Sequence, residues 1–175
     1  MILCTGNPAD QTVASAVKKR FDSVDFASRT TGYDLRLNSA DSEKYFKQQI
    51  LKYNVFINSS YIAPGVQLRL LETVYLEWMR ENVFGHVINL GSTIEWKNEP
   101  EHAEYIENKK KLRTRSLELS SQAGITGVKS THVIVSGLND GRPGHENWLD
   151  LERVADVIHW ILHTKSNITL IQVEP

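Results

Sequence analysis

A serine, a tyrosine and a lysine stand at fixed spacings in the second half of the chain. Ser92 closes the apolar run 86–92, and Tyr105 and Lys109 follow in the segment Tyr-Ile-Glu-Asn-Lys. Because an α-helix repeats every 3.6 residues, Tyr105 and Lys109 share one helix face, a turn apart. A nearby ammonium is expected to lower the pKa of the Tyr105 phenol from its usual value near 10. With a serine hydroxyl to hold a carbonyl oxygen, these groups are suited to pass a proton to or from an alcohol.

Length and composition limit the class of protein. The 175 residues suit one domain, 1–175, with a sizeable core, and the apolar runs are too short to span a bilayer. The N-terminal Met-Ile-Leu-Cys-Thr-Gly is typical of a first strand and not of a signal peptide. Cys4 has no cysteine partner, which fits a reducing, cytoplasmic compartment. The net charge is −1 and acids offset the basic clusters, so we expect neither a nucleic-acid nor a membrane partner.

Predicted strands and helices alternate along the chain. The expected strands are 2–4, 24–27, 55–57, 87–90, 132–135 and 168–173, and the expected helices are 11–21, 39–52, 66–81, 101–122 and 149–163. Short apolar strands joined by helices predict a parallel sheet with both faces covered. Right-handed crossovers then give a doubly wound α/β fold of three layers, α/β/α, around six to seven strands.

Small or polar residues follow five of the predicted strands. In doubly wound sheets the ligand crevice lies beyond the carboxyl ends of the strands. The residues at these ends are Thr5 and Gly6, Ser28 and Arg29, Asn58 with Ser59 and Ser60, Ser92, and Ser136 with Gly137. The sequence therefore predicts a binding site along this edge.

Ser92 followed thirteen residues later by Tyr-x-x-x-Lys from 105 to 109 resembles the short-chain dehydrogenase/reductase family. Segment 55–60 resembles the family's Asn-Asn-Ala-Gly strand with Asn58 retained, and 132–137 stands where the family has a Pro-Gly segment. Tyr33-Asp34-Leu35 resembles the pair that the family places against adenine.

The resemblance implies a Rossmann-like, NAD(P)-dependent oxidoreductase acting on a small carbonyl or alcohol substrate. Tyr105 would be the acid/base, Lys109 would hold the ribose, and Ser92 would orient the reacting oxygen. The expected cofactor contacts are Thr5, Gly6, Asn7, Ser28, Arg29, Asp34, Leu35, Asn58, Ser59, Tyr105, Lys109, Ser136 and Gly137. No metal site is expected: His159 and His163 are a turn apart but flank the apolar residues 160–162.

The end of the second predicted strand bears on the cofactor. It carries no carboxylate for a ribose 2′-hydroxyl, whereas Arg29 can pair with a 2′-phosphate. This favours NADP over NAD. An ordinary surface arginine is the alternative.

The chain also departs from the family pattern. Asp10 and Thr12 replace two glycines of the phosphate loop, and a carboxylate there opposes a pyrophosphate unless Asp10 caps its own helix. The interval from Arg29 to Asp34 is too short for a helix and a full strand, so one crossover is expected to be lost. The family's relay asparagine is missing from helix 66–81.

These departures leave other functions open. One is a non-catalytic dinucleotide-binding or scaffold module on the same fold. Another is a protein for a different nucleotide or a sugar phosphate, with the Ser-Tyr-Lys set coincidental. Loop 139–148 is either a short lid or an ordinary connection, and the apolar faces of helices 66–81 and 101–122 suit a homodimer or homotetramer.

Overall fold

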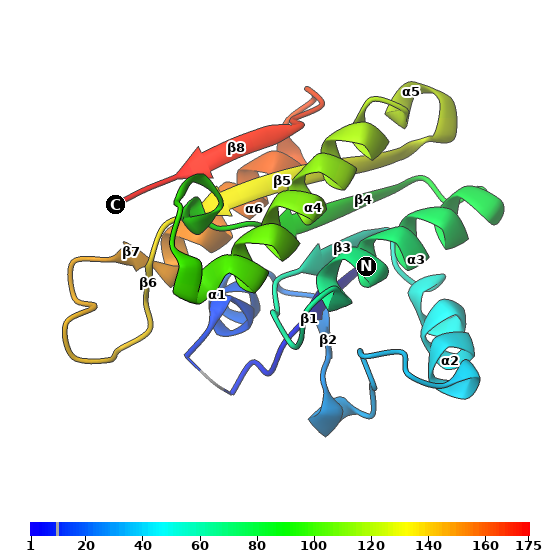
Figure 1. Ribbon diagram of the computed structural model, residues 1–175. Helices are drawn as coiled ribbons and strands as arrows, with labels where there is room; N and C mark the ends of the chain where they lie inside the picture. Colours follow the sequence, from blue (N-terminus) through cyan, green and yellow to red (C-terminus); the bar gives the residue numbers. More distant parts are fainter. Residues whose placement is uncertain (10) are drawn as a thin grey trace.

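The computed structural model describes residues 1–9 and 11–175, and its centre is a six-stranded sheet (Figure 1). The strands lie in the order β2-β1-β3-β4-β5-β8, and every neighbouring pair is parallel. Their bounds are β1 Ile2–Thr5, β2 Val24–Ala27, β3 Val55–Asn58, β4 Gly85–Leu90, β5 Val128–Val135 and β8 Leu170–Val173. The predicted parallel sheet is confirmed.

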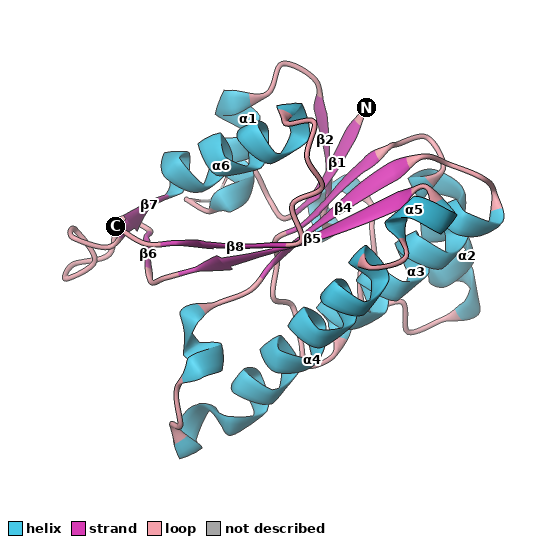
Figure 2. Ribbon diagram, turned by 90° about the horizontal axis from the view of Figure 1, so that it is seen from above, coloured by secondary structure: helices cyan, strands magenta, loops and turns pink. Residues whose placement is uncertain are grey.

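Helices cover both faces of this sheet (Figure 2). One layer holds α1 (Val13–Arg20) and α6 (Leu151–His163), and the other holds α2 (Ala40–Ile50), α3 (Val66–Arg80), α4 (Ala103–Ser120) and the short α5 (Ala123–Thr126). The shorter elements are the 3₁₀ turns η1 (Arg29–Thr31), η2 (Thr93–Trp96) and η3 (Pro100–His102) and the paired β6 (Leu138–Asn139) and β7 (Leu149–Asp150). The three-layer arrangement agrees with the predicted α/β/α fold.

Side chains from neighbouring strands line up in register on each face. Leu3 is opposite Phe56, and Phe56 is opposite Val87; all three are buried in the core against α2, α3 and α4. The next residue of each strand points to the opposite face, where Cys4, Ile57 and Ile88 join the core beneath α1 and α6. Both faces of the strands are thus apolar, as expected for a covered parallel sheet.

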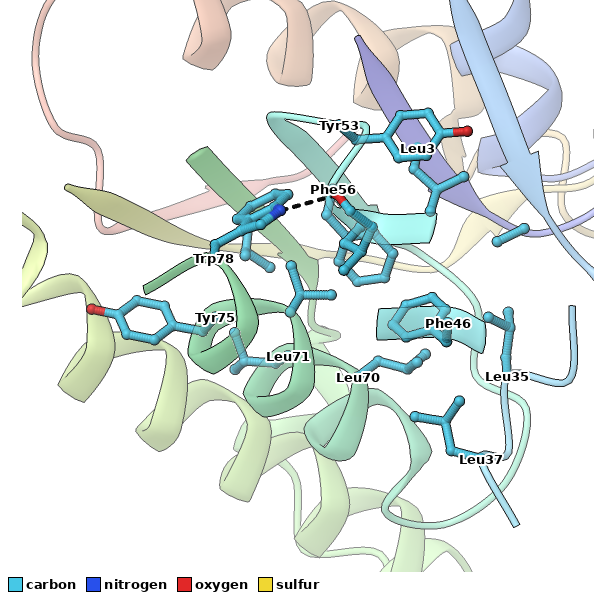
Figure 3. Packing of buried hydrophobic residues seen from close by; sticks show 14 of the residues in the cluster. Leu3, Leu35, Leu37, Phe46, Tyr53, Phe56, Leu70, Leu71, Tyr75 and Trp78 are labelled. Atoms are coloured by element: carbon cyan, nitrogen blue, oxygen red, sulfur yellow. Dashed lines mark hydrogen bonds between the residues drawn. The ribbon is translucent and has the colours of Figure 1, made fainter. Parts of the chain in front are cut away.

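Aromatic residues fill the core on the α2–α4 side (Figure 3). The Phe46 and Phe56 rings meet edge to face, with centroids 6.0 Å apart, and Trp78 is fully buried. The Trp78 indole donates to the backbone oxygen of Ile50 at 3.1 Å, so its N–H is satisfied although it is buried. This contact fixes α3 against the end of α2.

The chain between β2 and β3 confirms that one crossover is shortened. Only η1 and an irregular stretch, 33–38, precede α2, and β2 is an edge strand of the six-stranded sheet. The expected helix 101–122 begins with η3, because Pro100 starts a separate turn, and α4 proper starts at Ala103. Among the described residues no helix has both the length and the apolar character needed to cross a bilayer.

Candidate functional site

Ser92 lies just beyond β4, at the carboxyl edge of the sheet. It caps η2: its hydroxyl accepts from the Ile94 N–H at 3.4 Å, and its own N–H donates to the Glu95 carboxylate at 3.2 Å. This reciprocal arrangement is a capping box. The turn therefore fixes the position of the serine at the edge where the sequence predicts a binding site.

The structure brings Tyr105 and Lys109 to the same place. Both lie in the first half of α4, and the Lys109 Nζ is 5.5 Å from the centroid of the Tyr105 ring. Ser92 lies close enough to the Tyr105 phenol to lower its pKa in part. The three predicted catalytic residues thus form one cluster, with Tyr105 half-buried and Lys109 only 4% exposed.

Lys109 is held by two neutral oxygen atoms. Its Nζ donates to Gln67 Oε1 and to the backbone oxygen of Leu90, both at 2.8 Å. Burial lowers the pKa of Lys109 to about 8, while the negative charge of Glu95 acts in the opposite direction. The amine therefore titrates much closer to neutrality than an ordinary lysine.

Gln67 is a site residue that our sequence prediction missed. Its side chain also donates to the Asn58 backbone oxygen at 3.0 Å, and the side chain is 4% exposed. The buried stripe of α3 runs through Gln67, Leu71 and Val74, whereas Leu68 is only half-buried. A glutamine at helical spacing from buried leucines is the signal that could have found it.

The pKa of the Tyr105 phenol corrects our expectation. Burial raises it above the usual value near 10; Ser92 lowers it in part, and Tyr61 and Glu95 raise it further. The predicted lowering of this pKa was therefore wrong in direction, because the removal of the phenolate from water is the largest cause of the shift. Tyr105 is a protonated phenol at neutral pH, so it is able to donate a proton.

Tyr61 covers this cluster. Its ring meets the Tyr105 ring edge to face, with centroids 4.7 Å apart, and the Lys109 Nζ is 5.9 Å from the Tyr61 centroid. Tyr61 is itself 40% exposed. It therefore stands between solvent and the two functional side chains of α4.

A cavity of about 390 Å³ lies beyond the ends of β1 and β2. This size falls in the range of about 300–1,000 Å³ that is usual for ligand sites. Six predicted cofactor residues line it: Gly6, Asn7, Ser28, Arg29, Asp34 and Leu35. Arg36 lines it as well, which places a second guanidinium beside Arg29.

The residues of this cavity fit a dinucleotide. Gly6 has a φ of +125°, and a Cβ there would lie 2.9 Å from Ser60 Oγ and 3.0 Å from the Ala14 Cβ. Only glycine suits that conformation and space. Two exposed arginines, Arg29 and Arg36, offer planar donors to a phosphate. The sequence also predicts that Asp10 either caps a helix or opposes a bound phosphate, but Asp10 lies outside the described residues. The N-cap residue of α1 is Thr12.

Thr5 and Asn58 do not reach this cavity. Both are 0% exposed. The Thr5 hydroxyl accepts from the Ser59 and Ser60 N–H groups at 2.9 and 3.0 Å, and the Asn58 amide donates to Asn89 Oδ1 at 3.0 Å. They hold neighbouring strands together instead of presenting groups to a ligand.

Ser59, Ser136 and Gly137 lie toward the loop between β6 and β7. A second cavity, of about 320 Å³, is lined by Ser59 and by Asp140 of that loop. Ser136 is half-buried, and a Cβ on Gly137 would lie 2.6 Å from the Trp148 ring. The loop therefore borders a cavity next to the predicted site, and this position fits either of the two predicted alternatives, a short lid or an ordinary connection.

The loop between β6 and β7 also contacts the segment between β1 and α1. A Cβ on Gly141 would lie 2.5 Å from Gln11 Oε1, so the Gln11 side chain packs directly on the Gly141 backbone. Inside the loop, Asp140 accepts from His145 Nδ1 at 2.8 Å and from Arg142 Nε at 2.7 Å. The Arg142 guanidinium holds the pKa of Asp140 well below its usual range.

Comparison with known proteins gives likeness at the level of structure. No family model and no curated protein sequence matches the chain. The structure of a serine dehydrogenase complexed with NADP+ superimposes with a TM-score of 0.78 at 17% identity, covering 100% of this chain and 95% of that one. A short chain dehydrogenase from Bacillus anthracis str. 'Ames Ancestor' gives 0.77 at 12% identity, covering 98% and 94%.

Structures with other nicotinamide cofactors are also similar. A short-chain dehydrogenase from Sphingobium yanoikuyae in complex with NADPH has a TM-score of 0.74 at 12% identity, covering 97% of this chain and 86% of that one. A 4-hydroxyisoleucine dehydrogenase complexed with NADH gives 0.77 at 14% identity, covering 98% and 96%. The predicted resemblance is confirmed for the fold: the chain has the Rossmann-like α/β fold of the short-chain dehydrogenases/reductases.

Proposed function

We propose that this protein is an NADP(H)-dependent oxidoreductase of the short-chain dehydrogenase/reductase type, acting on a small carbonyl or alcohol substrate. The observation that carries the proposal is the cluster of Ser92, Tyr105 and Lys109 at the carboxyl edge of the sheet. A cavity lined by Gly6 and Arg29 opens at the same edge. The fold and the cofactors in the similar structures support this assignment.

Each residue of the cluster has a defined role in this proposal. The raised pKa of Tyr105 keeps its phenol protonated, so in the reducing direction it donates that proton to the carbonyl oxygen. The Ser92 hydroxyl donates a hydrogen bond to the same oxygen and orients it. When bound, the nicotinamide cofactor supplies or accepts the hydride. In the oxidising direction the Tyr105 oxygen takes the alcohol proton.

Lys109 stabilises the phenolate that forms as the Tyr105 proton leaves. Two of its three ammonium protons are held by Gln67 and Leu90, which leaves one for a ribose hydroxyl or a water molecule. Because both acceptors are neutral, they do not cancel the positive charge. The charge therefore still acts on Tyr105, from 5.5 Å to its ring centroid.

Arg29 and Arg36 favour NADP(H) over NAD(H). Both line the cavity beyond β2, where a ribose 2′-phosphate would meet a guanidinium. We expect the double variant Arg29→Ala/Arg36→Ala to lose at least tenfold in NADPH affinity while NADH affinity changes little. Equal losses for the two cofactors would contradict this preference.

The mechanism is tested with Tyr105→Phe. We expect NADPH-dependent reduction across a panel of aldehydes and ketones to fall by about 10²–10⁴-fold, because the variant lacks the acid. Fluorescence titration should give an unchanged NADPH affinity. Tyr45→Phe, at a 42% exposed tyrosine of α2, is the matched control. Full activity in Tyr105→Phe would disprove the mechanism.

The contact between Tyr61 and Tyr105 favours a second candidate, a dinucleotide-binding module without turnover. Tyr61 occupies space in front of the phenol that a substrate would need. Thermal-shift measurements with NADPH, followed by the carbonyl panel on the wild type and on Tyr61→Ala, separate the two. Stabilisation by NADPH without turnover in either protein would support the module.

The assembly that we propose is a homodimer or homotetramer through α3 and α4. On α3, Leu76 and Met79 are 50% and 40% exposed, which leaves apolar surface for a second copy. Sedimentation equilibrium of the wild type and of Leu76→Glu tests this. A monomeric wild type would contradict it.

A further inference from the structure

Glu95 is a carboxylate enclosed by the protein directly behind Ser92. It lies in η2, three residues after the serine, and its side chain is 0% exposed. Acidic side chains are rarely this buried unless they are paired, because removing a carboxylate from water costs free energy. The burial of Glu95 therefore has to be explained by its contacts.

These contacts come from three different elements. Oε1 accepts from the Ser92 backbone N–H at 3.2 Å and lies 3.0 Å from His132 Nε2 on β5. Oε2 lies 3.4 Å from Arg113 Nε on α4. Glu95 thus connects the serine turn, strand β5 and the helix that carries Tyr105 and Lys109.

His132 contributes a hydrogen bond and not a charge. It is fully buried, and burial lowers its pKa, with Glu95 acting in the opposite direction. The neutral ring donates from Nε2 to Glu95, and Nδ1 has no hydrogen-bond partner among the described residues. The cation beside the Glu95 carboxylate is Arg113, whose Nε lies 3.4 Å from Oε2 and whose guanidinium stacks 4.0 Å from the Trp96 ring centroid.

The backbone that leads into Ser92 packs against the Glu95–His132 pair. A Cβ on Gly91 would collide with His132 Nε2 and lie 2.5 Å from Glu95 Oε1. The backbone before the serine therefore runs in direct contact with the Glu95–His132 pair, so a change in the pair is transmitted to Ser92.

The charge of Glu95 also reaches the rest of the site. Arg113 is one helical turn after Lys109, on the same face of α4. Burial lowers the pKa of Lys109 and Glu95 raises it again in part. The titratable groups that face this region are Tyr105, Lys109 and Arg113 from α4, His132 from β5 and Tyr61 from the segment after β3.

We propose that Glu95 is a positioning residue of this site: its buried carboxylate fixes the Ser92 turn against β5 and α4 and supplies the counter-charge to the Lys109 ammonium. The role in turnover rests on the proposed function. The role toward Lys109 is a property of the free protein and is measurable without a substrate.

The test separates charge from geometry with three variants. Glu95→Gln keeps the hydrogen bonds but removes the charge, and Glu95→Asp keeps the charge but withdraws it by one methylene. Arg113→Met, at a side chain 20% exposed, leaves the carboxylate without its cation. Glu107→Gln, at an exposed glutamate of α4, is the control with the same change in net charge. The Lys109 titration is followed by NMR of ¹³C-labelled lysine.

In Glu95→Gln we expect the ratio of ammonium to amine at Lys109 to fall about tenfold at a given pH, the lower end of the effect of a nearby opposite charge. In Arg113→Met we expect the ratio to rise, because a repelling cation is lost. Glu95→Asp and Glu107→Gln should titrate near the wild type. Both Glu95 variants should lower kcat for reduction. Glu95→Asp displaces Ser92, and Glu95→Gln changes the charge of Lys109.

A Lys109 titration that moves neither in Glu95→Gln nor in Arg113→Met would overturn the inference. If Glu95→Gln does not fold, as judged by near-UV circular dichroism, Arg113→Met alone decides: an unchanged titration refutes the role. If the titration moves as expected but the wild type turns over no carbonyl in the panel, the proposed function fails and the role of Glu95 toward Lys109 stands.

Discussion

Replacing Gln67 by methionine removes one of the two oxygen atoms that hold the Lys109 ammonium. The two side chains have similar volume, so the change leaves little cavity. A hydrogen bond to a charged group contributes roughly 1.5–3 kcal/mol, and we expect the free energy of unfolding near pH 6.5 to fall by about 2 kcal/mol. The Leu90 oxygen still accepts from Nζ, at 2.8 Å, so Lys109 keeps one partner.

The size of this effect should depend on pH, and its sign follows from the lowered pKa of Lys109. Folding lowers that pKa from 10.5 to about 8. Between these values the unfolded chain binds more protons, so wild-type stability rises with pH across the window. At pH values below 8 this lowering of the Lys109 pKa destabilises the folded wild type by about 3 kcal/mol, because a change of one unit in pKa corresponds to about 1.4 kcal/mol.

Above pH 8 the amine of folded wild type is mostly neutral, and a neutral hydrogen bond contributes only about 1 kcal/mol. The deficit of Gln67→Met should therefore shrink from about 2 kcal/mol at pH 6.5 to about 1 kcal/mol at pH 9.5. Other lysines and tyrosines titrate in this range too, but they do so alike in both proteins and cancel in the difference.

The assay is urea unfolding of the two proteins at pH 6.5, 8 and 9.5, followed by tryptophan fluorescence. Gln48→Met, at an exposed glutamine of α2, is the matched control and should change stability by less than about 0.5 kcal/mol at every pH. A deficit for Gln67→Met that is equal at pH 6.5 and pH 9.5 would refute the reasoning, because it would show that the lost contact does not involve an ionised Lys109.

Three further changes test other parts of the structure. Thr5→Val leaves the buried amides of Ser59 and Ser60 without their acceptor and should lower the unfolding free energy by about 2–4 kcal/mol, whereas Thr5→Ser should retain most of it. Burial lowers the pKa of His86 to about 4, so wild-type stability should fall as pH drops from 6.5 toward 4, and His86→Gln should flatten that acid limb in urea titrations. Gly6→Ala forces a side chain onto a backbone with φ +125° and should weaken NADPH binding at least tenfold by fluorescence titration; unchanged affinity would mean that the cofactor does not approach this loop.

The sheet was predictable from sequence because its strands are short and apolar on both faces. The first half of β5 was not. It begins at Val128, four residues before the predicted start, and contains Ser130 and Thr131, both fully buried. Polar residues are normally typical of exposed segments. Their partners, such as Ser116 on α4 at 2.8 Å from Ser130, come from other elements, so the local pattern carries no sign of their burial.

The candidate site was likewise predictable from the sequence only in part. The spacing of Ser92, Tyr105 and Lys109 predicts that they meet, since a helix turn and a strand end settle the geometry. Gln67 and Glu95 were missed because their roles depend on residues 42 and 37 positions away, Lys109 and His132. The direction of the Tyr105 pKa failed for a related reason: the degree of burial is a tertiary property.

The charges around Tyr105 suggest why the lysine is held by neutral groups. Had a carboxylate bonded Lys109 directly, the pair would be neutral and would do little to stabilise a phenolate. Here the direct acceptors are the Gln67 amide and the Leu90 carbonyl, and the charge of Glu95 is shared with Arg113. With His132 neutral, one positive charge is left over in the cluster. Tyr105 therefore stays protonated until an oxygen accepts its proton, and the phenolate then forms beside a cluster with a net positive charge. This charge stabilises the phenolate until the acid is reprotonated for the next turnover.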